Sequence, residues 1–183
     1  MFVTPEIIAE IEKQYGKPEE RSARFEMSVR HFANLKSSQK NGRSHDVTLF
    51  IRKDDKFVVI AKHFYPPGLY RPPSGGINPG EGFVDGAKRE AKEETGCDVE
   101  LVRYLMRVSV EFFCGAEAVD WTSHVFLADY ISGVIKPLDT VEIREIALAG
   151  IDKFLYFKEL LLASDSGGMH YRAYLHDEIL KIL

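Results

Sequence analysis

The chain has 183 residues, which is enough for one domain with a complete hydrophobic core, and its length gives little reason to expect a second domain. Hydrophobic residues make up 45% and charged residues 28% of the sequence, as in an ordinary globular protein, which excludes a disordered or collagen-like chain. The formal net charge of -4 gives no general attraction to nucleic acid or anionic membranes, so a nucleic-acid partner would need a local basic patch.

The cysteines and the N-terminal residues indicate the cellular compartment. The two cysteines, Cys97 and Cys114, are too few for a disulfide framework and lack the paired spacing of a zinc site. We interpret them as buried thiols of a reducing compartment. Pro5 and Glu6 stand where a signal peptide needs an apolar run, and no segment has the roughly 18 apolar residues of a membrane span. The sequence predicts a cytoplasmic protein with no membrane partner.

Residues 1–44 are predicted to form an N-terminal helical extension. Apolar residues at helical spacing predict one helix over residues 5–15 and a second over residues 19–36, and the polar run 37–44 then breaks the pattern. We expect the extension to pack on the rest of the chain or to form a homodimer contact.

From Asp46 the pattern changes to β, and strands and helices then alternate without regular βαβ spacing. This order predicts an α/β sandwich with a mixed sheet rather than a doubly wound parallel sheet. The expected elements are a hairpin over 47–64, a proline- and glycine-rich loop over 65–76, a helix over 83–95, strands over 99–113, 121–132 and 145–149, and helices over 151–163 and 171–183.

The predicted helix over 83–95 carries clustered carboxylates. Glu90 stands three and four residues before Glu93 and Glu94, and each such like-charge pair costs an isolated helix a few tenths of a kcal/mol. Arg89 can pair with Glu93, but one arginine cannot neutralise three carboxylates. A divalent cation can, and the hard ions Mg²⁺ and Mn²⁺ prefer oxygen ligands. From composition alone, a solvated charged helix face is the alternative interpretation.

The same segment resembles the Nudix box, which reads Gly, five residues, Glu, seven residues, Arg-Glu, an aliphatic residue, any residue, Glu-Glu, any residue, Gly and an aliphatic residue. The matching residues are Gly75, Glu81, Arg89, Glu90, Ala91, Glu93, Glu94, Gly96 and Cys97. Only Ala91 and Cys97 depart from the pattern, and neither departure removes a charge. The resemblance implies a Nudix-type α/β/α sandwich, with a Nudix hydrolase domain over residues 45–183 behind the helical extension.

The resemblance also implies roles for the charged residues of the box. Glu90 and Glu94 are expected as the principal metal ligands, and Glu93 as a further ligand or water activator. Arg89 is expected to orient Glu90 and Glu93. Glu81 is expected to bind metal or to support the residues that do.

Three positions near the box are candidates for substrate binding. Gly75 and Gly76 resemble the family's turn that faces the diphosphate. Arg71, just upstream, is a candidate phosphate ligand, with a surface arginine as the alternative. Trp121, the only tryptophan, is a candidate to stack on a base, with core or interface packing as the alternative.

A distal acid is expected after the box. The segment EIREIALAGIDKF resembles a later family strand in which a Glu stands six residues before a Trp, which makes Glu142 the expected acid. Leu148 takes the place of the Trp, so the alignment leaves Glu145 open. For each acid, a surface position at a strand edge is the alternative.

The activity implied by the resemblance is metal-dependent hydrolysis of a phosphoanhydride bond in a nucleoside diphosphate linked to another group, with Mg²⁺ or Mn²⁺ as cofactor and Glu93 or Glu142 accepting the proton. Two alternatives stay open. One is a Nudix-fold nucleotide-binding or regulatory domain without catalysis. The other is an enzyme similar to isopentenyl diphosphate isomerase, for which neither Cys97 nor Cys114 has an obvious catalytic context.

Overall fold

A seven-stranded mixed sheet forms the centre of the computed structural model, which describes residues 3–39, 42–78 and 80–183. The strands are β1 (Glu19–Glu26), β2 (His45–Lys53), β3 (Lys56–Lys62), β4 (Ser74–Gly76), β5 (Cys97–Cys114), β6 (Glu117–Gly133) and β7 (Ile143–Ala149). Their order is β1-β5-β6-β2-β3-β7, with β4 paired to β2. The β1–β5 and β2–β6 pairs are parallel and the other pairs antiparallel, so the predicted mixed sheet is confirmed.

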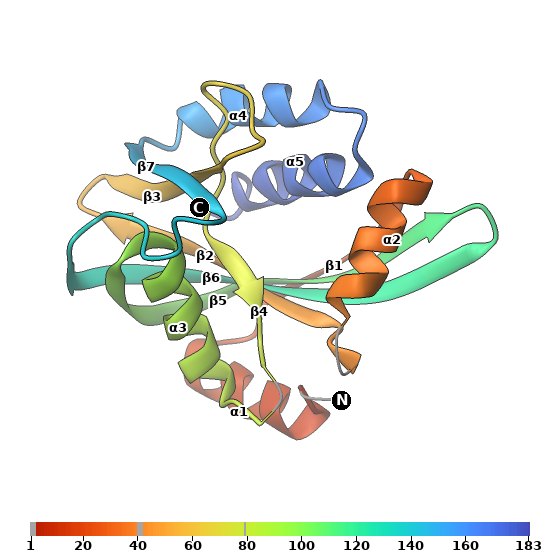
Figure 1. Ribbon diagram of the computed structural model, residues 1–183. Coiled ribbons are helices and arrows are strands. Elements are labelled where there is room, and N and C mark those ends of the chain that lie inside the picture. The colour runs from red at the N-terminus through yellow and green to blue at the C-terminus, as the bar shows by residue number, and fades with distance from the viewer. Residues whose placement is uncertain (1–2, 40–41, 79) are drawn as a thin grey trace.

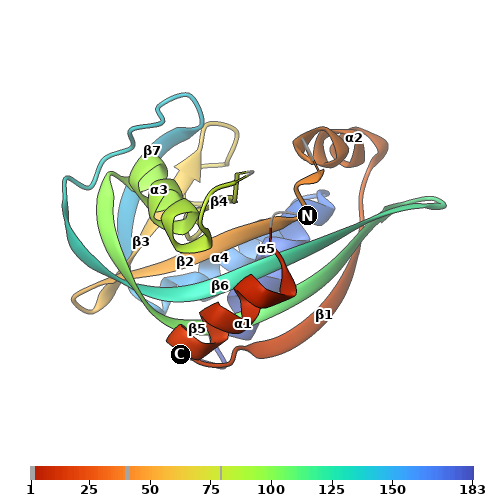
Figure 2. The same cartoon turned by 90° about the horizontal axis from the view of Figure 1, so that it is seen from below.

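Helices cover both faces of the sheet (Figures 1 and 2). They are α1 (Pro5–Tyr15), α2 (Val29–Ser38), α3 (Phe83–Thr95), α4 (Lys153–Leu162) and α5 (Gly167–Ile179). Side chains from α1 and α3 pack with one face in one hydrophobic cluster, and those from α2, α4 and α5 pack with the other face in a second. The predicted α/β/α sandwich is therefore confirmed. Within the described ranges, none of these helices is long and apolar enough to cross a membrane.

The N-terminal segment differs from the prediction. The helix over 5–15 is present as α1, but the single helix predicted over 19–36 is wrong, because strand β1 and the separate helix α2 occupy that region. Ser28 ends the strand region and caps α2 by accepting a hydrogen bond from the His31 amide. The expectation of a purely helical segment is therefore wrong, because the segment also contributes an edge strand to the sheet.

The wrong assignment has a physical cause. Phe25, Val29 and Phe32 have nearly helical spacing, but exposed and half-buried side chains alternate along β1 with the period of a strand. Val29 is 78% exposed, so it does not belong to an apolar stripe. β1 pairs with the outer half of β5, a tertiary contact that overrides local helical spacing. The sheet thus crosses the predicted domain boundary at residues 44 and 45, and that division stays a prediction.

The other elements agree with the predictions in type and differ in extent. β5 and β6 span 18 and 17 residues, longer than expected, and form a hairpin that projects beyond the helices, with β1 and α2 beside it (Figures 1 and 2). The last helix, α5, begins at Gly167 rather than at residue 171. β7 begins at Ile143, directly after Glu142. The segment that carries the expected distal acid therefore lies at the start of an edge strand.

Helix α1 offers a direct test of how the N-terminal segment packs. Ile11 is 4% exposed within the cluster that α1 shares with α3. We expect Ile11→Ala to lower the free energy of unfolding by about 2–4 kcal/mol, because the substitution removes buried methyl groups and leaves a cavity. Chemical denaturation monitored by circular dichroism measures this change.

The matched control is Ile131→Ala on β6, where the isoleucine is 62% exposed. It should change the free energy of unfolding by less than about 0.5 kcal/mol. If both variants unfold like the parent protein, α1 does not pack on the sheet in solution.

Candidate active site

Helix α3 carries the acid-rich motif and is fixed at both ends. It begins after Gly82, with Asp85 in the first turn, where the helix dipole favours an anion. It ends at Gly96, whose φ of 72° is in the left-handed region. A Cβ on Gly96 would lie 2.4 Å from the Val134 carbonyl oxygen and 2.6 Å from that of Lys136, so the following loop packs directly on the helix end.

Small side chains seat α3 close to the sheet. Ala87 and Ala91 are fully buried, and Phe83 is 5% exposed. Ala91 occupies a box position where the family pattern has a larger aliphatic residue, and its size allows this close approach. The glutamates therefore lie at the border between the packed face and solvent, where their exposure differs from one residue to the next.

Arg89 is the centre of the carboxylate cluster. Its Nε and Nη2 donate to both carboxylate oxygens of Glu81, at 2.7 and 3.0 Å. Its Nη1 donates to Glu90 Oε1 and Glu93 Oε2, both at 2.9 Å, and Nη2 also donates to the Gly76 carbonyl oxygen at 3.1 Å. The Glu81 hydrogen bonds are the main cause that raises the pKa of Arg89, and those same bonds lower the pKa of Glu81. One guanidinium thus fixes three carboxylates relative to the glycine turn, which is Gly75 and Gly76 at the end of β4.

Glu90 occupies the space in front of Gly75. A Cβ on Gly75 would lie 1.9 Å from Glu90 Oε2, so a larger residue at this position would force the Glu90 carboxylate to move. The Glu90 side chain is 14% exposed. Burial raises the pKa of Glu90 and the charges of Glu94 and Glu93 raise it further, while the hydrogen bond from Arg89 opposes them. The ionised form of Glu90 is therefore incompletely compensated by the protein.

Glu94 points to the strand side of the cluster. Its side chain is 7% exposed and accepts hydrogen bonds from the Ser74 amide at 2.7 Å and from Arg71 Nη2 at 3.4 Å. Arg71 is 1% exposed, so its placement as a surface arginine is wrong. Its other donors reach Tyr65 Oη and the Ser74 hydroxyl, at 3.0 and 2.8 Å. Contact of Arg71 with a phosphate stays a prediction, and its observed partners are protein groups.

The loop before β7 is attached to the end of α3. The Glu93 carbonyl oxygen accepts hydrogen bonds from the Leu138 and Asp139 amides, at 3.0 and 2.9 Å. The Asp139 carboxylate in turn accepts from the Val141 and Glu142 amides, at 2.9 and 3.1 Å. The backbone of the expected distal acid is thereby connected to the acid-rich helix through two successive turns.

Glu142 and Glu145 have different partners. Glu142 Oε2 lies 2.5 Å from Nζ of Lys62 at the end of β3, whereas Glu145 pairs with the neighbouring Arg144 at 2.9 Å. Both acid side chains are about half exposed, at 58% and 47%. Lys62 was not identified from the sequence, because it lies on another strand and belongs to no motif. The choice of distal acid stays a prediction.

The acids of α3 do not converge on one point. Over residues 3–39, 42–78 and 80–183, no three His, Cys, Asp or Glu side chains are grouped closely enough to hold a metal ion as they stand. Glu90 and Glu93 face Arg89, while Glu94 is turned to the Ser74 amide. The roles of Glu81, Glu90, Glu93 and Glu94 as metal ligands therefore stay predictions.

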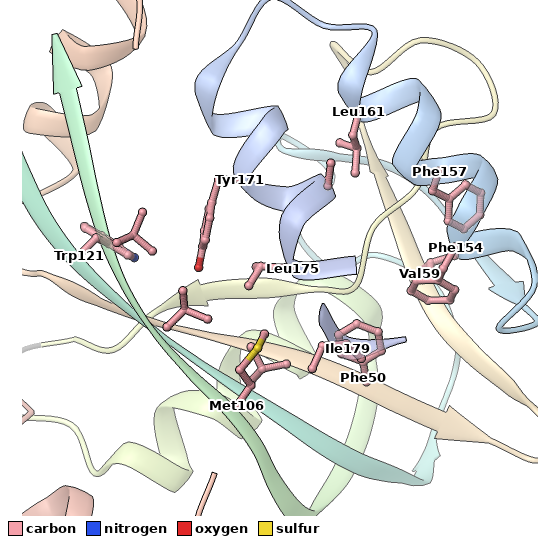
Figure 3. Close-up of a cluster of buried hydrophobic side chains, with 14 of the residues drawn as sticks. Phe50, Val59, Met106, Trp121, Phe154, Phe157, Leu161, Tyr171, Leu175 and Ile179 are labelled. Carbon is pink, nitrogen blue, oxygen red and sulfur yellow. The ribbon is translucent and has the colours of Figure 1, made fainter. Parts of the chain in front are cut away.

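Trp121 and helix α3 pack in different hydrophobic clusters, on opposite faces of the sheet. Trp121 is 8% exposed and belongs to the cluster that α2, α4 and α5 form with the sheet (Figure 3). It also lines a cavity of about 340 Å³. Asp46 and Arg172 line the same cavity. Neither was singled out from the sequence, because no motif connects residues so far apart in the chain.

The cysteines offer no accessible nucleophile next to the carboxylates. Cys97 is fully buried directly after α3, and burial raises the pKa of its thiol. Cys114 ends β5 at the tip of the long hairpin. Neither position favours the isomerase alternative.

Comparison with known proteins agrees with the motif. The family model for the NUDIX domain matches residues 42–170. The chain is 29% identical to the oxidized purine nucleoside triphosphate hydrolase of Mus musculus over 56% of the chain and 63% of that protein. It is 31% identical to the NAD-capped RNA hydrolase NudC of Vibrio atlanticus (strain LGP32), over 50% of the chain and 32% of that protein. The chain thus spans less than two thirds of either relative.

Solved structures share the fold. A NUDIX hydrolase from Nitrosomonas europaea aligns with a TM-score of 0.53 at 21% identity, over 77% of this chain and 95% of the other. A UDP-X diphosphatase aligns with a TM-score of 0.51 at 16% identity, over 94% of this chain and 79% of the other. With the motif, the sandwich and the family match together, this chain belongs to the NUDIX domain family.

The contact between Gly75 and Glu90 predicts a specific coupling. Gly75→Ala should lower the free energy of unfolding by about 1–3 kcal/mol, because the new methyl group overlaps the buried Glu90 carboxylate. In a Glu90→Ala background the same substitution should cost much less, because the overlap is removed. A double-mutant cycle from chemical denaturation measures this coupling.

Gly150→Ala is the matched control, since its added Cβ meets only the Asp152 carboxylate, whose side chain is 75% exposed and can move. An equal cost of Gly75→Ala in both backgrounds would show that Glu90 does not occupy this position.

Proposed function

We propose that this protein hydrolyses a phosphoanhydride bond in a nucleoside diphosphate linked to another group, with a divalent metal ion as cofactor. The observation that carries the proposal is the packing of the acid-rich helix α3 against the glycine turn, with Glu90 filling the space that Gly75 leaves. The two curated relatives are named as hydrolases of an oxidized purine nucleoside triphosphate and of NAD-capped RNA, which supports a phosphoanhydride as the bond cleaved.

The chemistry of the donor set fits a hard divalent cation such as Mg²⁺ or Mn²⁺. Burial and the neighbouring carboxylates both disfavour the charge on Glu90, and a cation would relieve both effects. In the described chain, Arg89 uses one oxygen of Glu90 and one of Glu93, and the second oxygen of each accepts no hydrogen bond. Glu90, Glu93 and Glu94 would hold the ion. When bound, it would neutralise phosphate oxygens and lower the pKa of a water molecule.

The chain's own residues orient these groups and accept a proton. Arg89 keeps Glu90 and Glu93 in fixed orientations, and its charge favours the ionised form of Glu90. Glu142 is the candidate general base, because the turn at Asp139 holds its backbone and Lys62 holds its carboxylate. Glu93, whose side chain is 51% exposed, is the second candidate.

A screen of nucleoside diphosphate derivatives tests the activity. We expect release of phosphate esters that requires Mg²⁺ or Mn²⁺, and a loss of roughly 10²- to 10⁴-fold in kcat for Glu90→Gln and Glu94→Gln. The same ions should raise the melting temperature of the parent protein, because they bind only the folded form, and should raise that of Glu94→Gln much less.

Glu100→Gln is the matched control, because Glu100 pairs with Lys88 on the exposed surface. It should keep both turnover and the metal-dependent rise in melting temperature. An undiminished rise in the Glu94→Gln protein would place the ion elsewhere, and turnover in the presence of a chelator would contradict the metal-dependent mechanism.

The distal acid is tested separately. If Glu142 is the general base, Glu142→Gln should lower kcat by roughly 10²- to 10⁴-fold at saturating substrate and leave the metal concentration for half-activation nearly unchanged. Higher pH should restore part of its kcat, because hydroxide can replace the missing base. Glu145→Gln is the matched comparison, and we expect it to keep most of its turnover. Full kcat in Glu142→Gln, together with a large loss in Glu145→Gln or Glu93→Gln, would move the base to that residue.

A further inference from the structure

The cavity beside Trp121 combines residues of the family match with residues outside it. Helix α2 forms one wall, and Arg172 of α5 lies two residues after the matched range of residues 42–170. Aromatic side chains contribute to the apolar lining, with Phe112 and Trp121 from the sheet and Tyr171 from α5. Trp121 and Tyr171 lie at the same end of the core cluster in Figure 3. A volume of about 340 Å³ is within the range of small-molecule sites.

Three contacts connect this cavity to the candidate active site. Asp46 pairs in register with Gly76 of the glycine turn. Lys62 lines the cavity, and its Nζ contacts Glu142 at 2.5 Å. Arg172 Nη1 lies 3.4 Å from the hydroxyl oxygen of Ser74, the residue whose amide donates to Glu94. The cavity therefore borders the glycine turn, next to the place where the proposed function puts the diphosphate of a substrate.

Asp46 and Arg172 bring opposite charges to the cavity without pairing. One oxygen of Asp46 accepts a hydrogen bond from the Ser123 hydroxyl. In the described part of the chain, the Arg172 side chain has no carboxylate partner within 4.0 Å, and its one hydrogen bond is that to Ser74. Burial raises the pKa of Asp46, while burial and the nearby Arg71 lower that of Arg172. Hydrogen bonds from Ser123 and Trp121 oppose the effect of burial on the pKa of Asp46. Arg172 thus retains hydrogen-bond donors that the protein does not use, and the Asp46 carboxylate is nearby.

We propose that this cavity is a specificity subsite for a planar base with an N–H group beside a carbonyl oxygen, with Asp46 accepting from the N–H and Arg172 donating to the carbonyl. Guanine and uracil carry such an edge, whereas adenine and cytosine place an amino group beside a ring nitrogen. The amino group and ring nitrogen of adenine and cytosine also offer a donor beside an acceptor. A carbonyl oxygen, however, has two lone pairs for the Arg172 guanidinium where a ring nitrogen has one, which favours the carbonyl edge. This assignment rests on the proposed function, because it places the substrate's diphosphate at α3.

Trp121 is the only tryptophan, so its fluorescence reports directly on the cavity. The probes are GMP, UMP, AMP and CMP in metal-free buffer, where binding is separated from turnover. We expect a saturable fluorescence change with GMP and UMP, and binding at least roughly ten-fold weaker for AMP and CMP. Arg172→Met and Asp46→Asn should each weaken GMP binding by roughly 10- to 100-fold, because each removes a charge-assisted hydrogen bond.

Arg52→Met and Asp129→Asn are the matched controls, because they remove the same groups from an exposed pair on β2 and β6. Both should bind GMP like the parent protein. Circular dichroism checks the fold of every variant. Arg172→Lys keeps the positive charge but lacks the planar guanidinium with its several N–H donors, and we expect it to weaken GMP binding as well. It provides the test if Arg172→Met does not fold.

Two results would overturn the subsite. One is the lack of a saturable Trp121 signal with all four nucleotides, and the other is equal GMP affinity in the cavity variants and their controls. The outcome is distinguishable from failure of the proposed function. Selective binding without any hydrolysis would contradict only the catalytic proposal, whereas hydrolysis that treats guanine and adenine derivatives alike and ignores Arg172→Met would contradict only the subsite.

Discussion

Repulsion among the carboxylates of α3, offset by the single guanidinium of Arg89, is the constraint on which the candidate site depends. Two unit charges about 4 Å apart interact by about 4 kcal/mol at an effective dielectric constant near 20, so a buried glutamate cluster without a counter-charge would disfavour the fold. Arg89 contacts Glu81, Glu90 and Glu93 together and also holds the Gly76 carbonyl. The Arg89 side chain therefore both holds the glycine turn and balances the charge of the helix. Arg89 does not contact Glu94, whose partners are Arg71 and the Ser74 amide.

Much of the site could be predicted from the sequence because its determinants are local. The limits of α3 follow from helical spacing and from Gly96, and both ends agree with the prediction. The contacts within the box join residues a few turns apart on one helix or in the loop directly before it, where spacing along the chain fixes proximity in space. Gly75 is an example, because its need for glycine follows from the approach of Glu90.

The rest depends on contacts between distant segments, which a single sequence does not specify. β1 became a strand because β5 offers it a pairing edge, although Phe25 has nearly helical spacing to Val29 and Phe32 further along the chain. Arg71 looked like a surface residue because its partners Tyr65 and Glu94 come together only when β4 packs beside α3. Asp46 and Arg172 are 126 positions apart, so no motif search connects them.

The attachment of the loop before β7 has a consequence for how this site can change over evolution. The loop is held by the backbone carbonyl of Glu93, whereas the Glu93 side chain points to Arg89. Because every residue has a backbone carbonyl, the side chain at position 93 can be exchanged without releasing the loop that carries Glu142. A substitution of the acid at position 93 would therefore leave the backbone that positions Glu142 in place. Evolution can vary the first acid without moving the second.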